Sequence, residues 1–143
     1  MEGIIVDMSF DVKTMATLNI IFQILLMILL SFAVFLAARK DLRKHCNTVR
    51  IVVLLQAASI IIVMLPSMLG YLNSGTPGVI FYNEMLFHHI LGLILIGLWI
   101  YINLAYSNII RRPGNFKSIM KYAFITWTLA FIIGLHLYIR IYL

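Results

Sequence analysis

The chain of 143 residues is dominated by apolar side chains: 63% of its residues are hydrophobic, 11% are charged, and the mean hydropathy is +1.03. This composition excludes a water-soluble globular domain and predicts an integral membrane protein. The net charge of +6 does not indicate nucleic-acid binding, because the basic residues form short clusters beside apolar runs, where membrane topology and anionic lipid account for them.

Four apolar runs are each long enough to cross a hydrocarbon core, which takes about 20 helical residues. They cover roughly residues 16–38, 47–70, 85–107 and 119–141. Because these runs leave no room for a soluble domain, we expect a single all-α domain over residues 1–143, a four-transmembrane-helix bundle with short loops. The tail before the first run is acidic and lacks a basic n-region, so we expect a retained helix and not a signal peptide.

Basic residues gather at two of the three connections and predict the orientation. Nine of the eleven Lys and Arg residues lie there: Arg39, Lys40, Arg43, Lys44, Arg50, Arg111, Arg112, Lys117 and Lys121. The positive-inside rule then predicts a multi-pass protein of the cell membrane with both basic loops cytoplasmic and both termini outside. The loop LNSGTPGVIFYNE is expected outside as well.

Histidines occur at one depth on two runs of opposite direction. The third run enters from outside near Glu84, so His88 and His89 lie about one turn inside the outer boundary. The fourth run leaves about five residues after His136. An ionisable side chain within a span is costly and commonly faces the protein interior, pairs with a partner or marks a functional path.

Adjacent helical residues point about 100° apart, so only one of His88 and His89 can easily face a common centre. We expect this to be His89, because Gly92 follows one turn later and leaves room for a planar group, as Gly134 does near His136. His88 is then a supporting partner or an interface residue.

The other two runs carry polar or thioether side chains at the corresponding level. Asn19 and Gln23 are an i, i+4 pair on one face of the first run, and Met64 and Met68 stand in the second run beside Pro66, which can kink the helix and free a carbonyl. Each also has a structural alternative. Asn19 and Gln23 can form hydrogen bonds between helices, Met64 and Met68 can be lipid-facing or core methionines, and Pro66 can be an ordinary helix terminus.

His45 lies elsewhere, at the cytoplasmic entrance of the second run beside Cys46, the single cysteine. It is too far from the outer layer to share its site. Either His45 snorkels to the headgroups or it forms a separate site in the cytoplasmic leaflet.

Two stretches resemble a known family. LNIIFQILLMILLSFAVFLAARKDLRKHCNTVRIVVLL, with LNxxF and K-x-x-R-K-H, and FHHILGLILIGLWIYINLAY followed by RRPGNFKSIMKYAFITWTLAFIIG, are similar to the CtaM/YozB-like family of small polytopic membrane proteins. The resemblance selects Asn19, His45 and His89. It implies a role in the maturation or activity of haem-copper terminal oxidases, and hence oxidase subunits as partners. Where the family pattern has a histidine at the outer end of the second span, this chain has Ser67 and Met68.

Three functions remain open on these residues. His89 and His136 could ligate a b-type haem, with Arg140 meeting a propionate, in a protein that serves oxidase assembly or membrane electron transfer. Copper could instead be held by the same histidines with Met64 or Met68, in a copper-handling chaperone. The third alternative is a structural membrane subunit whose histidines make interhelical hydrogen bonds. In all three we expect binding or assembly and no substrate turnover.

A homo-oligomer, if formed, is expected to associate through helix faces. Cys46 is single, so it cannot form an intrachain disulfide, and its cytoplasmic position does not favour one between chains. Ala33 and Ala37 are spaced for close helix approach.

The orientation can be tested with single cysteines in a Cys46→Ala background. Gly75→Cys should react with a membrane-impermeant maleimide applied from outside intact cells, and Asn115→Cys should react only after the membrane is opened, because basic loops stay cytoplasmic. Labelling of position 115 in intact cells would refute this orientation.

Overall fold

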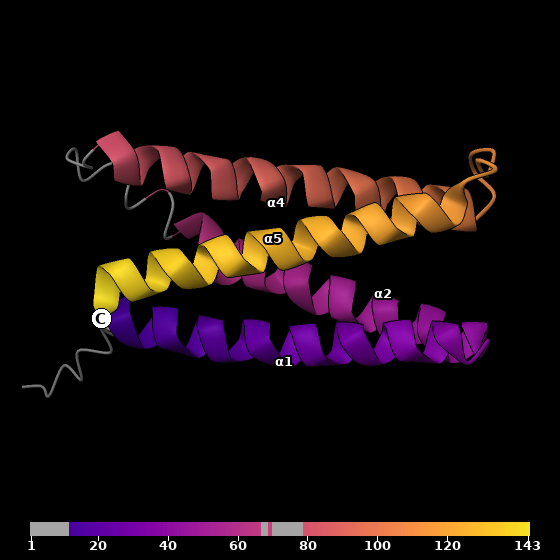
Figure 1. Cartoon of the computed structure of the whole chain (residues 1–143), viewed down its shortest axis with the longest axis horizontal. Coiled ribbons are helices and arrows are strands. Elements are labelled where there is room, and N and C mark those ends of the chain that lie inside the picture. The colour runs from indigo at the N-terminus through magenta and orange to yellow at the C-terminus, as the bar shows by residue number, and fades with distance from the viewer. Residues whose placement is uncertain (1–11, 67–68, 70–78) are drawn as a thin grey trace, which may run out of the picture. The chain divides into compact units, whose positions relative to one another are not determined.

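The structure is a computed structural model that describes residues 12–66, 69 and 79–143. Its elements are α1 (Val12–Ala38), α2 (Leu42–Ser59) with the π-helix η1 (Ile60–Met64), α4 (Val79–Tyr106) and α5 (Phe116–Tyr142). Figure 1 shows these helices, and the described residues contain no strand. The predicted all-α fold with four membrane-length helices is confirmed.

The four candidate spans agree with the predicted runs and differ at their ends. They are Lys13–Ala38, Leu42–Met64, Tyr82–Tyr106 and Phe116–Tyr142. The second begins earlier than predicted, because Asp41 caps α2 and the basic residues after it are already helical. Its predicted end near residue 70 lies mostly outside the described residues.

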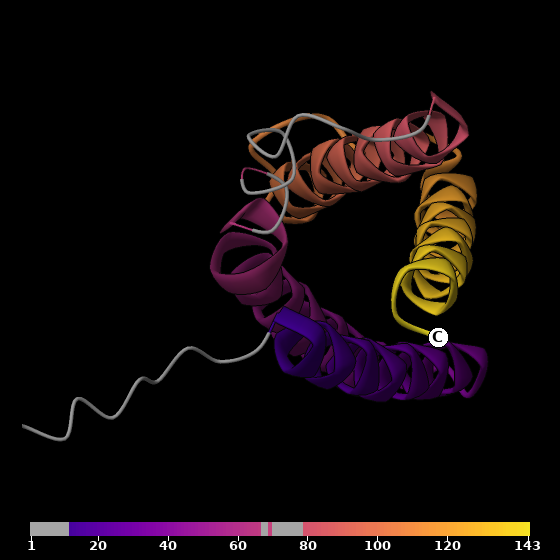
Figure 2. The same cartoon turned by 90° about the vertical axis from the view of Figure 1, so that its left-hand side faces the viewer.

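The chain divides into two compact units, one ending at Leu69 and the other beginning at Gly70. Each is a helical hairpin: α1 packs on α2 in the first, and α4 packs on α5 in the second. Figure 2 shows the two helices of each hairpin side by side.

The first hairpin is held together by a narrow stripe on each helix. On α1, Leu26, Leu30 and Ala33 are buried at spacings of four and three residues, and on α2 Val52 is completely buried. These spacings place the buried side chains on one helical face. Because Ala33 has a small side chain and no exposed surface, it lets the two backbones approach closely within the hairpin.

The second hairpin is centred on two tryptophans. Trp99 of α4 and Trp127 of α5 are both buried, and their rings meet edge to face with centroids 4.7 Å apart. Ala123 and Ala130, one turn to either side of Trp127, are also buried. Small side chains here leave room for the two large rings, since helix contacts in a membrane depend on close van der Waals packing.

The remaining helix faces present aliphatic side chains outward. Ile28, Leu54 and Leu93 are 60%, 70% and 69% exposed. Such surfaces suit a lipid environment, in which apolar side chains need no burial against protein. The structure thus agrees with a multi-pass membrane protein.

Both hairpin turns begin with the same backbone motif. After α1, Lys40 has φ 63°, its N–H bonds to Ala37 O, and the Asp41 N–H bonds to Leu36 O. After α4, Asn108 takes the same left-handed conformation, with φ 57°. This Schellman motif satisfies the last helical carbonyls and reverses the chain in few residues.

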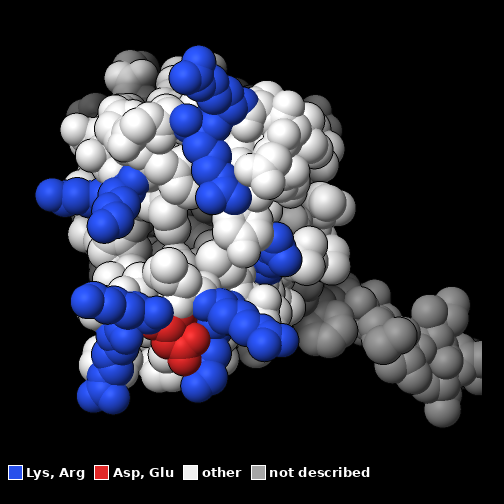
Figure 3. Space-filling model, turned by 90° about the vertical axis from the view of Figure 1, so that its right-hand side faces the viewer, with Lys and Arg blue, Asp and Glu red and all other residues white. Residues whose placement is uncertain are grey.

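Basic side chains stand at the turn of each hairpin, as Figure 3 shows. One of them, Arg112, is also structural, because its guanidinium donates to the carbonyls of Ala105 and Tyr106 at 3.1 and 3.0 Å. A cation at a helix C-terminus both satisfies these carbonyls and opposes the helix dipole.

Asp41 caps the N-terminus of α2 and leads to a prediction that depends on pH. Its carboxylate accepts from the Lys44 N–H at 3.2 Å and pairs with Lys44 Nζ at 3.0 Å, and these interactions with Lys44 lower its pKa from the ordinary 3.8. Because this pKa is lower in the folded turn than in the unfolded chain, the ionised cap contributes its full stabilisation above the unfolded pKa. That stabilisation is lost as the pH falls through the folded pKa. Protection of the amides in the first turn of α2, relative to their intrinsic exchange rates at the same pH, should therefore fall on acidification.

The control is Asp41→Asn, which keeps an N-cap acceptor without a titrating group. The ratio of exchange rates at the Lys44 amide, wild type over Asp41→Asn, should rise below about pH 4. Asp41→Ala should exchange faster than both at neutral pH. A ratio that stays constant with pH would contradict the assignment.

Candidate functional site: the histidines of the second hairpin

His88 connects the two helices of the second hairpin. Its Nδ1 lies 3.0 Å from the backbone oxygen of Ala130 on α5, and its ring lies over Gly134, where an added Cβ would be 2.9 Å from Cε1. We expected Gly134 to leave room beside His136, but in the structure His88 occupies that space. Glycine at this position leaves the space that the imidazole occupies, and a Cβ there would force the ring to shift.

His89 is turned away from this contact. Its Nδ1 lies 2.7 Å from the oxygen of Met85, one turn earlier on the same helix, and its ring meets that of His88 edge to face at 5.7 Å. Among the described residues, the ring nitrogen that bonds to α5 is thus that of His88, while the bond of His89 stays within α4. No described atom lies within 4 Å of a Cβ built on Gly92, so the space expected there is open. The role of His89 as a ligand stays a prediction.

The two hydrogen bonds determine the tautomers of both rings. A backbone oxygen can only accept, so Nδ1 of His88 and of His89 must carry the hydrogen. In a neutral imidazole the lone pair then resides on Nε2. Metal-binding histidines commonly have this arrangement, in which the ring N–H donates to a carbonyl and the other nitrogen is the ligand.

His136 belongs to an ionic cluster at the same end of the hairpin. Glu84, one turn before His88 on α4, accepts from Arg140 Nη1 at 2.9 Å through both carboxylate oxygens, and His136 Nδ1 lies 3.6 Å from the same carboxylate. We expected Arg140 to be available for a propionate, and the structure engages it with Glu84. Glu84 and Arg140 can both be read from the sequence, but their pairing depends on the register of α4 against α5.

The predicted polar pair of α1 is brought together through a third residue. Gln23 Nε2 donates to Ser59 Oγ at 3.2 Å, and Ser59 Oγ donates to Asn19 Oδ1 at 2.9 Å. Sequence reasoning found the shared face of Asn19 and Gln23 but missed Ser59, whose only signal is a hydroxyl inside an apolar run.

His45 also connects two helices. It is 6% exposed, and its Nδ1 lies 2.8 Å from the oxygen of Ala33. Its ring is thus buried at the turn end of the first hairpin, where it holds α2 against α1. The neighbouring Cys46 is a half-buried free thiol.

The sulfur ligands expected for copper are only partly described. Met64 is half-buried in η1, and Met68 lies outside the described residues. Within the described part of the chain, no three His, Cys, Asp or Glu residues are grouped to hold a metal ion. Haem iron needs no such group, because the protein supplies only its axial ligands.

Comparisons of the chain with protein-family models, curated proteins and solved structures gave no match.

The contact between His88 and Gly134 predicts the effect of a single methyl group. Gly134→Ala should push the imidazole from Ala130 O and destabilise the hairpin by about 1 kcal/mol, the typical size of an interhelical hydrogen bond in a membrane protein. In a His88→Ala background the same change should cost nothing. Unfolding in micelles measures the four variants of this cycle.

Gly92→Ala is the matched control, since its Cβ meets no described atom and alanine has a higher helix propensity than glycine. It should be neutral or slightly stabilising. Equal effects of Gly92→Ala and Gly134→Ala would show that the His88 contact has no energetic role.

Proposed function

We propose that this chain is a multi-pass protein of the cell membrane, with cytoplasmic basic loops, that binds a b-type haem through imidazoles of its second hairpin. In line with its resemblance to the CtaM/YozB-like family, we place this binding in the maturation of haem-copper oxidases, with oxidase subunits as partners. The protein would then supply binding and orientation, and no substrate turnover.

One observation carries the proposal: Nδ1 of both His88 and His89 is committed to a backbone oxygen. Each ring is held in one orientation, and each presents Nε2 in an apolar segment. Three features are suited to axial ligation of haem: imidazole as the ligand, a carbonyl that fixes its tautomer, and aliphatic neighbours. Haem bound there would supply reversible one-electron chemistry.

The ligand assignment follows from the geometry of the two rings. His88 and His89 are adjacent on one helix, with side chains about 100° apart and ring centroids at 5.7 Å, so they cannot bind opposite faces of one haem iron. His89 remains our first ligand because His88 is packed over Gly134. His136, with a largely exposed side chain, is the second.

A structural subunit is the second candidate, and a specific observation favours it. His45 and His88 each donate across a hairpin to a backbone oxygen, which is how a histidine acts when it only holds helices together. The two candidates differ in what they require of His89 and His136, neither of which bridges its hairpin by a hydrogen bond to the backbone.

Absorption spectroscopy and metal analysis of the purified full-length protein test the proposal. Haem binding predicts a Soret band with about one iron per chain, and His89→Ala and His136→Ala should each lose it while the protein stays inserted. Gln is the control replacement at position 136, since it keeps a polar group near Glu84 but is not a haem ligand.

The copper-handling and structural alternatives predict different results. Copper without a Soret band, lost in Met64→Leu and Met68→Leu, would replace haem by a copper-handling role. A colourless, metal-free protein that gains no Soret band when haem is added would refute the cofactor proposal and leave the structural subunit.

A further inference from the structure

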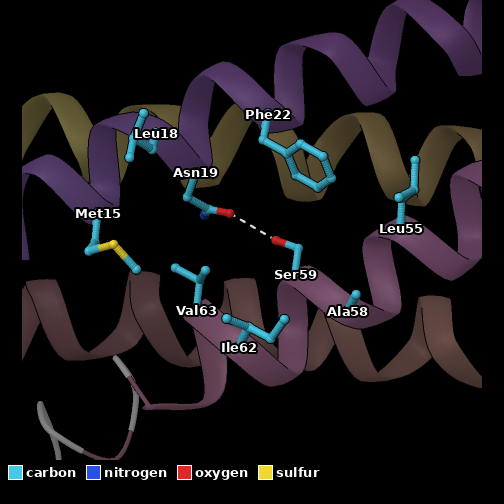
Figure 4. Close-up of a pocket in the computed structure, with 9 residues that line it drawn as sticks. All are labelled: Met15, Leu18, Asn19, Phe22, Leu55, Ala58, Ser59, Ile62 and Val63. Atoms are coloured by element: carbon cyan, nitrogen blue, oxygen red, sulfur yellow. Dashed lines mark hydrogen bonds between the residues drawn. The ribbon is translucent and has the colours of Figure 1, made fainter.

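The first hairpin contains a pocket that the histidine site does not use. Its volume is about 360 Å³, and Figure 4 shows side chains of α1, α2 and η1 around it. Its apolar wall includes Met15, Leu18, Phe22, Leu55, Ile62 and Val63. Because all its lining residues belong to the first hairpin, the pocket is a feature of that hairpin alone.

One polar group on the wall has a donor that bonds to no described residue. The chain of hydrogen bonds runs from Gln23 through Ser59 to Asn19 Oδ1, and Figure 4 shows the last of these bonds facing the pocket. Asn19 accepts with its oxygen, and its Nδ2 group donates to none of the residues that the structure describes. Bonds in series polarise one another, so this amide is a stronger donor than an isolated one.

The backbone beside the pocket departs from the α-helix. The π-helix η1 begins directly after Ser59, and Leu65 N–H bonds to Ile60 O, five residues earlier. Pro66 follows and has no N–H for the carbonyl four residues before it. Ile62 and Val63, which line the pocket, belong to this widened turn. Such π-turns occur frequently at functional sites.

We propose that this pocket binds a membrane-dissolved molecule that places a carbonyl oxygen on Asn19 Nδ2 and an apolar body against the pocket wall. An apolar wall within a membrane span selects molecules that dissolve in the bilayer. An amide N–H favours a molecule with a hydrogen-bond acceptor over a plain hydrocarbon chain. Two sources share this chemistry: the acyl ester of a phospholipid and the ring carbonyl of an isoprenoid quinone. The site is independent of haem binding.

Photolabelling of the full-length protein in nanodiscs tests the site and distinguishes the sources. One probe is an isoprenoid quinone that carries a diazirine, and the other is a phosphatidylcholine with a diazirine in its acyl chain. Labelling should be saturable and should map to peptides around Met15–Phe22 and Leu55–Val63. Competition by unlabelled quinone but not by added phospholipid identifies a quinone, and the reverse identifies an acyl ester; either result supports the site.

Two variants separate the amide from the pocket. Asn19→Leu keeps the shape and removes the donor, so labelling at subsaturating probe should fall about fivefold, as expected for one hydrogen bond. Ala58→Phe, at an exposed position that lines the pocket, should fill the pocket and reduce labelling more than Asn19→Leu does. It also tests the pocket independently if Asn19→Leu fails to insert.

Asn103→Leu is the matched control, because the amide of Asn103 bonds to Trp99 O in its own helix and lies in the other hairpin. Its labelling should equal that of the wild type. Equal labelling of Asn19→Leu, Ala58→Phe and wild type would overturn the proposal, as would labelling of the pocket peptides no stronger than that of the lipid-facing remainder of α1.

Discussion

A polar side chain inside the hydrocarbon layer must find its hydrogen-bond partner within the protein, because no water is available to replace it. A side chain buried against protein has the same requirement, and both hairpins meet it in the same way. His45 donates to Ala33 O across the first, and His88 donates to Ala130 O across the second. In each case the acceptor is the backbone oxygen of a buried alanine, whose small side chain lets an imidazole reach the main chain.

The use of a backbone acceptor has a consequence for the helices themselves. The oxygens of Ala33 and Ala130 lie within α1 and α5, where each also accepts the helical N–H four residues later. A carbonyl has two lone pairs, so it can accept from the imidazole without losing its helical bond. Histidine can thus join two helices while both remain regular. The departure from the α-helix occurs instead at η1, directly before Pro66.

Much of the fold could be predicted from sequence, because the length and hydropathy of the four runs reflect bilayer thickness alone. The contacts of the site could not. His88 and His89 are equivalent in a hydropathy pattern, and only the register of α4 against α5 places His88 opposite Gly134. Asn19 and Gln23 share a face by spacing, but their link through Ser59 depends on the crossing of α1 and α2. Backbone acceptors such as Ala130 O leave no trace in the sequence.

Bifunctional side chains explain why structural contacts and binding can share residues here. An imidazole or an amide has two polar ends, and the hairpins use only one of them: Nδ1 of His88 and Oδ1 of Asn19. Gln56 shows the complementary case, since its buried Oε1 has no partner among the described residues. In a bilayer an unused polar end keeps its full cost of desolvation. The same packing that holds each hairpin together therefore also leaves groups that favour a ligand.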